Sequence, residues 1–227
     1  AFCCGLFQTM KIRTTEELMN YLDDDLAWRR KEVIELRSIA RSAKAKKADV
    51  HVRAGVAMLY AHWEGFIKNA SNAYVVFVSA LGIKTRELQD SFVALSMKAK
   101  LAQMGDSGKS SVAVPAIAHL MSILDKPALL PAAGITADGN LKSEVFVNIA
   151  GWLGIDVARY TARFNLIDET LLASRNKIAH GEYLNISPQR FDSLAEEIME
   201  LMIWFKTDLE NAAACRSFQR KGELINA

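Results

Sequence analysis

Proline and cysteine are both scarce in this chain. Only 4 prolines occur in 227 residues, so little interrupts long helices. The 3 cysteines, of which Cys3 and Cys4 are adjacent, are too few for a disulfide framework. No Cys/His spacing resembles a zinc site. This cysteine usage indicates a reducing, cytoplasmic setting, and we expect neither a metal nor another cofactor.

A long apolar run and a strong net charge are also missing. No apolar stretch is long and charge-free enough to span a bilayer, so we expect no membrane partner. The formal net charge of +2 is too small to indicate nucleic-acid binding, and any such contact needs a local patch. On a helix, the side chains of the consecutive residues Asp23, Asp24 and Asp25 point in different directions. This predicts a solvated acidic turn rather than a metal site.

The residues that are abundant favour helices. Hydrophobic residues make up 51% of the chain, which is enough for a substantial core. Thr14 to Glu17 has the pattern of a capping box, and Ser187-Pro188 is typical of a helix start. Apolar residues recur at helical spacing between these signals. We expect helices over about 14–45, 48–82, 85–104, 114–124, 143–153 and 166–179, and from 188 onward.

These patterns predict an all-α fold with a single helical bundle, in which long antiparallel helices form the frame. We expect this domain to cover residues 14–220. Residues 1–13 are expected to be an N-terminal extension, and residues 221–227 a C-terminal tail.

The most informative stretch runs from Arg175 to His180 and is followed at once by Gly181. Cleavage of a phosphodiester needs a group that transfers protons near neutral pH and a fixed cation, and His and Arg are suited to these tasks. Positions five apart on a helix differ by about 140°, so Arg175 and His180 do not share a face, whereas Asn176 and His180 do. Either Arg175 reaches round the helix, or a twofold-related subunit completes the site.

A purely structural interpretation of this stretch is also open. Basic residues are favoured in the last turn of any helix, where they complement the dipole and its free carbonyls. Glycine directly after the helix is the commonest stop signal. Arg175 and His180 could therefore simply cap a helix.

Three segments together resemble the HEPN superfamily, in particular the stand-alone bacterial HEPN-like nucleases of toxin–antitoxin and phage-defence systems. They are R-A-G-V-A-M-L-Y-A-H-W-E-G-F-I-K (53–68), G-N-L-K-S-E-V-F-V-N-I-A-G-W-L-G-I-D (139–156) and L-I-D-E-T-L-L-A-S-R-N-K-I-A-H-G-E (166–182). The third segment is the specific one, because it matches the family's Arg, polar residue and following His. One branch of the family has a Tyr two positions after this His, where the present chain has Glu182.

The resemblance implies a metal-independent endoribonuclease that works as a homodimer on an RNA substrate. By this resemblance His180 activates the ribose 2′-OH, Arg175 holds the scissile phosphate, and Asn176 orients His180 from one helical turn away. Glu64 and Glu182 are candidate supporting residues, although Glu64 could equally form an ordinary i,i+4 pair with Lys68. A cognate antitoxin or a neighbouring defence protein is a possible further partner.

Two other functions are compatible with the same residues. The first is a non-catalytic helical HEPN module that binds nucleotide, RNA or a partner protein. The second is a helical antitoxin or scaffold, in which Arg175 and His180 only cap a helix. Cleavage of RNA by the purified protein separates the nuclease from both.

Overall fold

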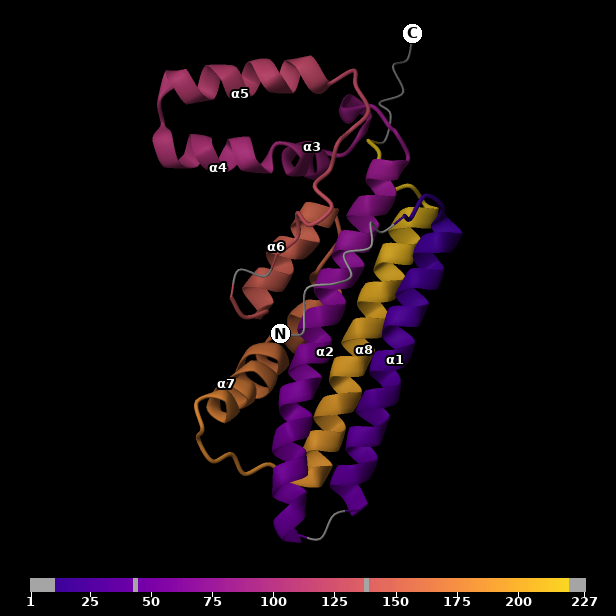
Figure 1. Ribbon diagram of the computed structural model, residues 1–227, viewed down its shortest axis with the longest axis vertical. Coiled ribbons are helices and arrows are strands. Elements are labelled where there is room, and N and C mark those ends of the chain that lie inside the picture. The colour runs from indigo at the N-terminus through magenta and orange to yellow at the C-terminus, as the bar shows by residue number, and fades with distance from the viewer. Residues whose placement is uncertain (1–10, 43–44, 137–138, 221–227) are drawn as a thin grey trace, which may run out of the picture.

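Three long helices lie side by side and form the frame of the protein (Figure 1). They are α1 (Thr15–Ser42), α2 (Ala45–Ala80) and α8 (Pro188–Ala214). The structure is a computed structural model that describes residues 11–42, 45–136 and 139–220. The described residues form one all-α domain, which confirms the predicted fold class. None of their helices combines the length and apolar character needed to cross a membrane.

Helix α2 lies at the centre because its apolar residues cover more than one face. It packs against α1 and α8 on one side and against α6 (Ser143–Leu153) and α7 (Ala173–Ala179) on the other. Trp63, Phe66 and Tyr74 on α2 are fully buried. A helix that is apolar on several faces needs neighbours on several faces, which explains the central position of α2.

The predicted start signals of α1 and α8 are confirmed. The Thr14 hydroxyl accepts from the Glu17 backbone N–H at 3.1 Å, and the Glu17 carboxylate accepts from the Thr14 N–H at 3.2 Å. The Ser187 hydroxyl accepts from the Arg190 N–H at 3.1 Å. Ile12, two residues before the expected start of the domain, is buried in the core. Residues 1–10 and 221–227 lie outside the described residues.

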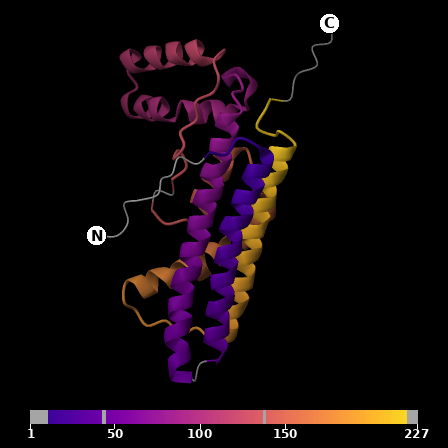
Figure 2. The same ribbon diagram turned by 45° about the vertical axis from the view of Figure 1, so that its right-hand side comes forward.

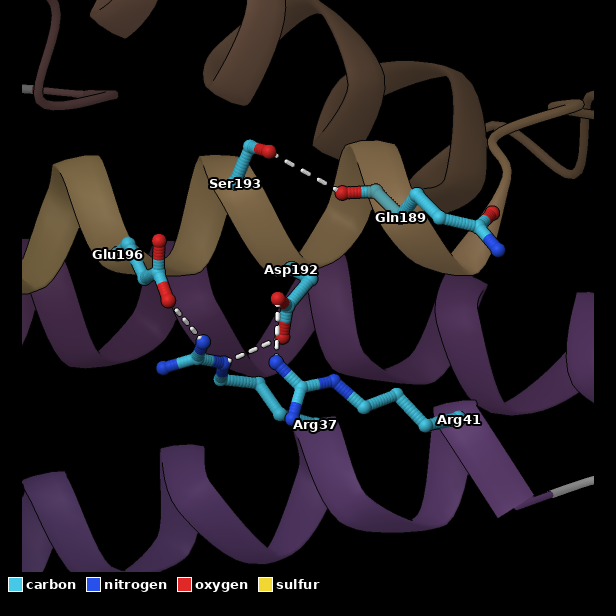
Figure 3. A network of polar contacts seen from close by, with 6 residues as sticks. All are labelled: Arg37, Arg41, Gln189, Asp192, Ser193 and Glu196. Carbon is cyan, nitrogen blue, oxygen red and sulfur yellow. Dashed lines mark hydrogen bonds and ion pairs between the residues drawn. The ribbon is translucent and has the colours of Figure 1, made fainter.

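An ion-pair network joins α1 to α8 near the start of α8 (Figure 3). Arg37 binds Asp192 at 2.6 Å and also contacts Glu196, while Arg41 binds the second oxygen of Asp192. The hydrogen bond from Arg37, with further help from Arg41, lowers the pKa of Asp192 to about 2. The Asp192 side chain is only 20% exposed, so this network is less screened than an ordinary surface pair.

The expectation of a solvated acidic turn at residues 23–25 is wrong for Asp25. Asp25 is buried, and both of its oxygens accept hydrogen bonds of 3.1 Å from Arg29. Arg29 also donates to the His62 carbonyl of α2. Gly65 makes this possible, because a Cβ there would lie 2.8 Å from the Arg29 guanidinium. Asp25 follows the buried Leu22 by three positions and so lies on the buried face of α1, but its charge alone indicated exposure.

A second close approach lies between α2 and α8. Gly55 faces the ring of Phe191, and a Cβ at this position would lie 2.5 Å from the Phe191 Cζ atom. Both residues are buried. The missing side chain of Gly55 therefore allows α8 to pack tightly against α2.

The single helix expected over 85–104 is not formed. It is replaced by the short 3-10 helix η1 (Thr85–Glu87), by α3 (Asp90–Ser96) and by α4 (Lys98–Ser107). Backbone pairing far along the chain explains why η1 is separate from α3, because Lys84 bridges Pro127 and Leu88 bridges Gln219 on either side of η1. Local periodicity cannot show such pairings.

Helices α4 and α5 (Ser110–Ile123) form a hairpin that projects from the top of the bundle (Figures 1 and 2). We call this hairpin, residues 98–123, the arm. No residue of α4 is buried, and Ala116 is the buried residue of α5. The arm lies at the top of Figure 1, whereas α7 lies beside the lower half of α2.

The segment that leads to α7 also departs from a regular α-helix. A 3-10 helix, η2 (Ala158–Arg163), is followed by a π-helix, η3 (Leu166–Leu172), which continues directly into α7. The expected single α-helix over 166–179 is thus part π and part α. A π-helical segment changes the direction in which the side chains that follow it point around the helix axis. Such segments frequently occur at functional sites.

Candidate functional site

The Arg175–His180 stretch occupies α7 and its end. His180 is the C-cap residue, and Gly181 follows with a φ of +77°. The Gly181 N–H donates to the Ile178 carbonyl at 3.1 Å, and the Glu182 N–H donates to the Lys177 carbonyl at 2.9 Å. This is the Schellman pattern of a helix C-terminus. The stop signal at Gly181 is confirmed, and backbone groups alone satisfy these two carbonyls.

The helix end therefore does not need the side chains that the capping interpretation assigns to it. The His180 side chain is exposed to solvent. The hydrogen bonds of the Arg175 guanidinium go to side chains, Asn140 and Asn176, rather than to the carbonyls at the end of α7. Neither contact is one that helix capping would require.

Arg175 is held in place by residues from three parts of the chain. Its Nη1 donates to the Asn176 Oδ1 at 3.0 Å, and its Nη2 donates to the Asn140 Oδ1. Asn140 also donates to the Asn176 Oδ1 at 3.4 Å, which closes a small ring of contacts. The guanidinium carbon lies 4.1 Å from the centre of the Tyr60 ring on α2. We call Tyr60, Asn140, Arg175 and Asn176 the arginine clamp.

Tyr60 provides the floor of the clamp. Its hydroxyl accepts from the Leu141 N–H at 2.7 Å, which fixes the loop residue next to Asn140. Burial, together with a hydrogen bond to Glu64, raises the pKa of Tyr60 to about 12. The phenol therefore stays neutral at physiological pH. Its ring face can attract the Arg175 cation without neutralising its charge.

The clamp leaves Arg175 suited to binding an anion. A guanidinium carries five N–H donors, and the contacts with Asn140, Asn176 and the Tyr60 hydroxyl use at most three of them. The side chain is only half-buried, so the remaining donors can reach a ligand. A planar guanidinium held in one orientation matches two oxygens of a phosphate.

The structure gives the predicted site residues different environments. The side chain of Asn176 contacts Arg175 and Asn140, and its link to His180 is the backbone bond from the His180 N–H to the Asn176 carbonyl at 2.9 Å. Glu64 forms the i,i+4 pair with Lys68 at 3.2 Å and also contacts Tyr60. It therefore lies next to the clamp as well as in an ordinary helix pair.

Glu182 contributes its backbone rather than its side chain to the contacts that fix this region. Its carbonyl accepts from Arg53 on α2 at 3.3 Å. The next residue, Tyr183, donates its hydroxyl to Asp49 at 3.1 Å, and its ring lies 5.9 Å from the Arg53 guanidinium carbon. These contacts attach the chain that follows His180 to the start of α2.

Sequence reasoning missed Tyr60 and Asn140. Tyr60 precedes Glu64 by one helical turn, so the two share a face of α2. Asn140 follows Gly139, which has a φ of +93°, at the end of a long loop. Both residues lie in segments that resemble the HEPN superfamily, but nothing in the sequence shows their distance from Arg175.

A site for a resident metal ion is not evident in the described ranges 11–42, 45–136 and 139–220. They contain no group of three or more His, Cys, Asp or Glu side chains that could hold one.

Comparison with known protein families shows which family the chain belongs to. Residues 18–218 match the family described as HEPN_MAE_28990:/-like HEPN. The match covers most of the chain, and the protein therefore belongs to this HEPN family. No curated protein and no solved structure matches the chain in the corresponding comparisons.

Proposed function

We propose that this HEPN protein is a metal-independent endoribonuclease, with Arg175 and His180 as its catalytic residues. The arginine clamp is the observation that carries the proposal. It holds a half-buried guanidinium in one orientation, although neither helix capping nor core packing calls for this. Membership of the HEPN family supports the same function, because its domains are often ribonucleases.

The proposed reaction uses the protein's own side chains. His180 accepts the proton of the ribose 2′-OH, and the 2′-oxygen then attacks the adjacent phosphorus. Arg175 donates hydrogen bonds to the phosphate oxygens and stabilises the negative charge that grows on them. The bond to the 5′-oxygen of the next nucleotide breaks, and that oxygen receives a proton. The products are a 2′,3′-cyclic phosphate and a 5′-hydroxyl.

A homodimer would supply the second proton-transfer group. Arg175 and His180 are five positions apart, and one helix cannot direct both side chains at one phosphate easily. A twofold axis near the end of α7 would bring Arg175 of one subunit close to His180 of the other. One His180 could then act as the base while the second protonates the leaving oxygen. We propose this dimer together with a role as a toxin or defence effector.

The direct test is cleavage of a defined RNA by the purified protein. We expect cleavage that leaves a 2′,3′-cyclic phosphate and that His180→Ala abolishes. His119→Ala is the matched control, because His119 is an exposed histidine on the arm. Wild-type protein that leaves RNA intact at every pH and protein concentration would refute the proposal and favour a non-catalytic HEPN module.

A cellular test addresses the proposed role. Expression of the wild-type chain should slow bacterial growth, and His180→Ala should restore growth at the same protein level. Growth that slows equally with both proteins would show that toxicity does not depend on RNA cleavage by this site.

A further inference from the structure

Tyr183 is the most exposed aromatic residue in the described part of the chain, and its ring is nevertheless held in place. The residue is 69% exposed. Its hydroxyl donates to the Asp49 carboxylate at 3.1 Å, and the Arg53 guanidinium carbon lies 5.9 Å from the centre of its ring. A tyrosine that anchored the chain by packing would bury its ring. Here polar and cationic contacts hold the side chain and leave most of the ring open to a ligand.

Helix α2 places this ring on the same side as the arginine clamp. Arg53 and Tyr60 are seven positions apart, which is close to two full turns, so they share a face of α2. They lie about 10 Å apart along the helix axis. Tyr183 contacts Arg53, and Arg175 stacks on Tyr60. The Tyr183 ring and the Arg175 guanidinium therefore lie along one side of α2, about two helical turns from each other.

His180 lies between these two groups along the chain. It precedes Tyr183 by three residues, so the two Cα atoms are at most about 11 Å apart. The segment that follows α7 runs back towards the lower end of α2 (Figure 1). The side chain of His180 is exposed, as is the Tyr183 ring. A nucleotide next to a phosphate held by Arg175 is large enough to reach this ring.

We propose that Tyr183 is a base-binding residue, on which the base of a nucleotide next to the scissile phosphate stacks. Every base has a flat π-face, and stacking on an aromatic side chain strengthens the binding of single strands. A ring that is fixed before the ligand arrives loses little rotational freedom on binding. The inference rests on the proposed RNA substrate but does not require that the RNA is cleaved.

Arg53 favours a nucleotide over an uncharged aromatic ligand at this position. Within the described residues, its guanidinium contacts the Glu182 carbonyl and the Tyr183 ring rather than a carboxylate. The hydrogen bond to Glu182 uses one of its five donors, and its Nε is buried without a partner. Arg53 therefore keeps a positive charge beside the ring, where the phosphate backbone attached to a stacked base would lie.

This role sets a requirement on the RNA. A base inside a duplex is already stacked between its neighbours and cannot reach the Tyr183 ring without leaving the duplex. We therefore expect the nucleotide that binds Tyr183 to be unpaired. We also expect different bases to be accepted there, because stacking does not depend on the hydrogen-bonding groups of the base.

The test is fluorescence anisotropy with two labelled single strands of about ten nucleotides. Both contain deoxyribose and cannot be cleaved, because they lack the 2′-OH; one carries bases, and the other is abasic with the same phosphates. Tyr183→Ala should weaken binding of the strand with bases by about 5- to 100-fold and leave binding of the abasic strand unchanged. Tyr183→Phe keeps the ring and should retain most of the affinity. Leu129→Ala is the matched control, because Leu129 is an 84% exposed apolar residue outside the site.

A wild type that binds neither strand, or binds both equally, would overturn the base-binding role. The same holds if Tyr183→Phe is as weak as Tyr183→Ala at unchanged helical circular dichroism, because the hydroxyl rather than the ring would then matter. RNA cleavage by the wild type separates this role from the proposed nuclease. Cleavage and strand binding that are both unaffected by Tyr183→Ala overturn the role of Tyr183 and leave the nuclease standing. A protein that cleaves no RNA but binds bases through Tyr183 supports this role and refutes the nuclease.

Discussion

Asn140 is the residue whose removal tests the arginine clamp most directly. Its side-chain oxygen accepts from Arg175, and its side-chain nitrogen donates to Asn176. Asn140→Ala removes both contacts but leaves the 3.0 Å bond from Arg175 to Asn176 and the stacking on Tyr60. The guanidinium should remain near its position and lose its fixed orientation.

The size of the effect follows from the contact that is lost. A hydrogen bond to a charged group contributes about 1.5–3 kcal/mol. If most of this loss falls on the transition state, RNA cleavage should slow by about 10- to 100-fold, since about 1.4 kcal/mol corresponds to a factor of ten. The stability of the fold should change by less than about 1 kcal/mol, because water can replace the lost contact at a half-buried group.

The assay is steady-state cleavage of a short RNA, with Asn148→Ala as the matched control on the exposed side of α6. A second measurement does not depend on activity. The Arg175 guanidinium signals in an NMR spectrum, assigned by their loss in Arg175→Lys, should report faster rotation of the guanidinium in Asn140→Ala. Asn140→Asp should keep the orientation but weaken substrate binding, because the added carboxylate competes with the phosphate for Arg175.

The reasoning would be refuted if Asn140→Ala cleaved RNA within twofold of wild type while Arg175→Ala had lost activity. If the wild type proves inactive, the NMR measurement still decides whether Asn140 restrains Arg175. Unchanged rotation of the guanidinium would show that Asn140 does not restrain Arg175, whether or not the protein is a nuclease.

Further predictions concern the site and the helix contacts. Arg175→Lys should lose at least 10-fold in cleavage rate although the charge is kept, because an ammonium lacks the planar fork; activity near the wild-type level would contradict this. Cleavage that depends on His180 should continue in a chelator such as EDTA, and its loss there would reveal a metal requirement. Gly55→Ala should lower the unfolding free energy by about 1–3 kcal/mol, because the new Cβ would overlap a buried ring. The matched change Gly105→Ala, in a helix position with open space, should instead raise it by up to about 1 kcal/mol, and chemical denaturation measures both. The carboxyl of Asp192 has its pKa lowered to about 2 in the fold, so its stabilisation is complete above about pH 4 and is lost as the pH falls towards 2. After a discount for partial exposure, the ionised Asp192 contributes about 1 kcal/mol to the free energy of unfolding. Asp192→Asn should remove this contribution and its loss at acidic pH.

The sequence by itself determined the helical class, the frame and the position of the motif. Capping signals at Thr14 and Ser187 marked the starts of α1 and α8, because these signals are local hydrogen bonds between neighbouring residues. Gly181 marked the end of α7 for the same reason, since it supplies the positive φ that the helix stop requires.

Only the tertiary structure decided which distant residues meet. The break between η1 and α3 accompanies backbone pairing of Leu88 with Gln219, which no local pattern shows. Asp25 is buried because Arg29 binds it against α2, and the charge of the residue alone indicated the opposite. The environment of Arg175 was also decided at this level, because Asn140 is 35 positions away in the sequence. Contacts of this kind form when helices pack, and their partners are set by three-dimensional position rather than by spacing along the chain.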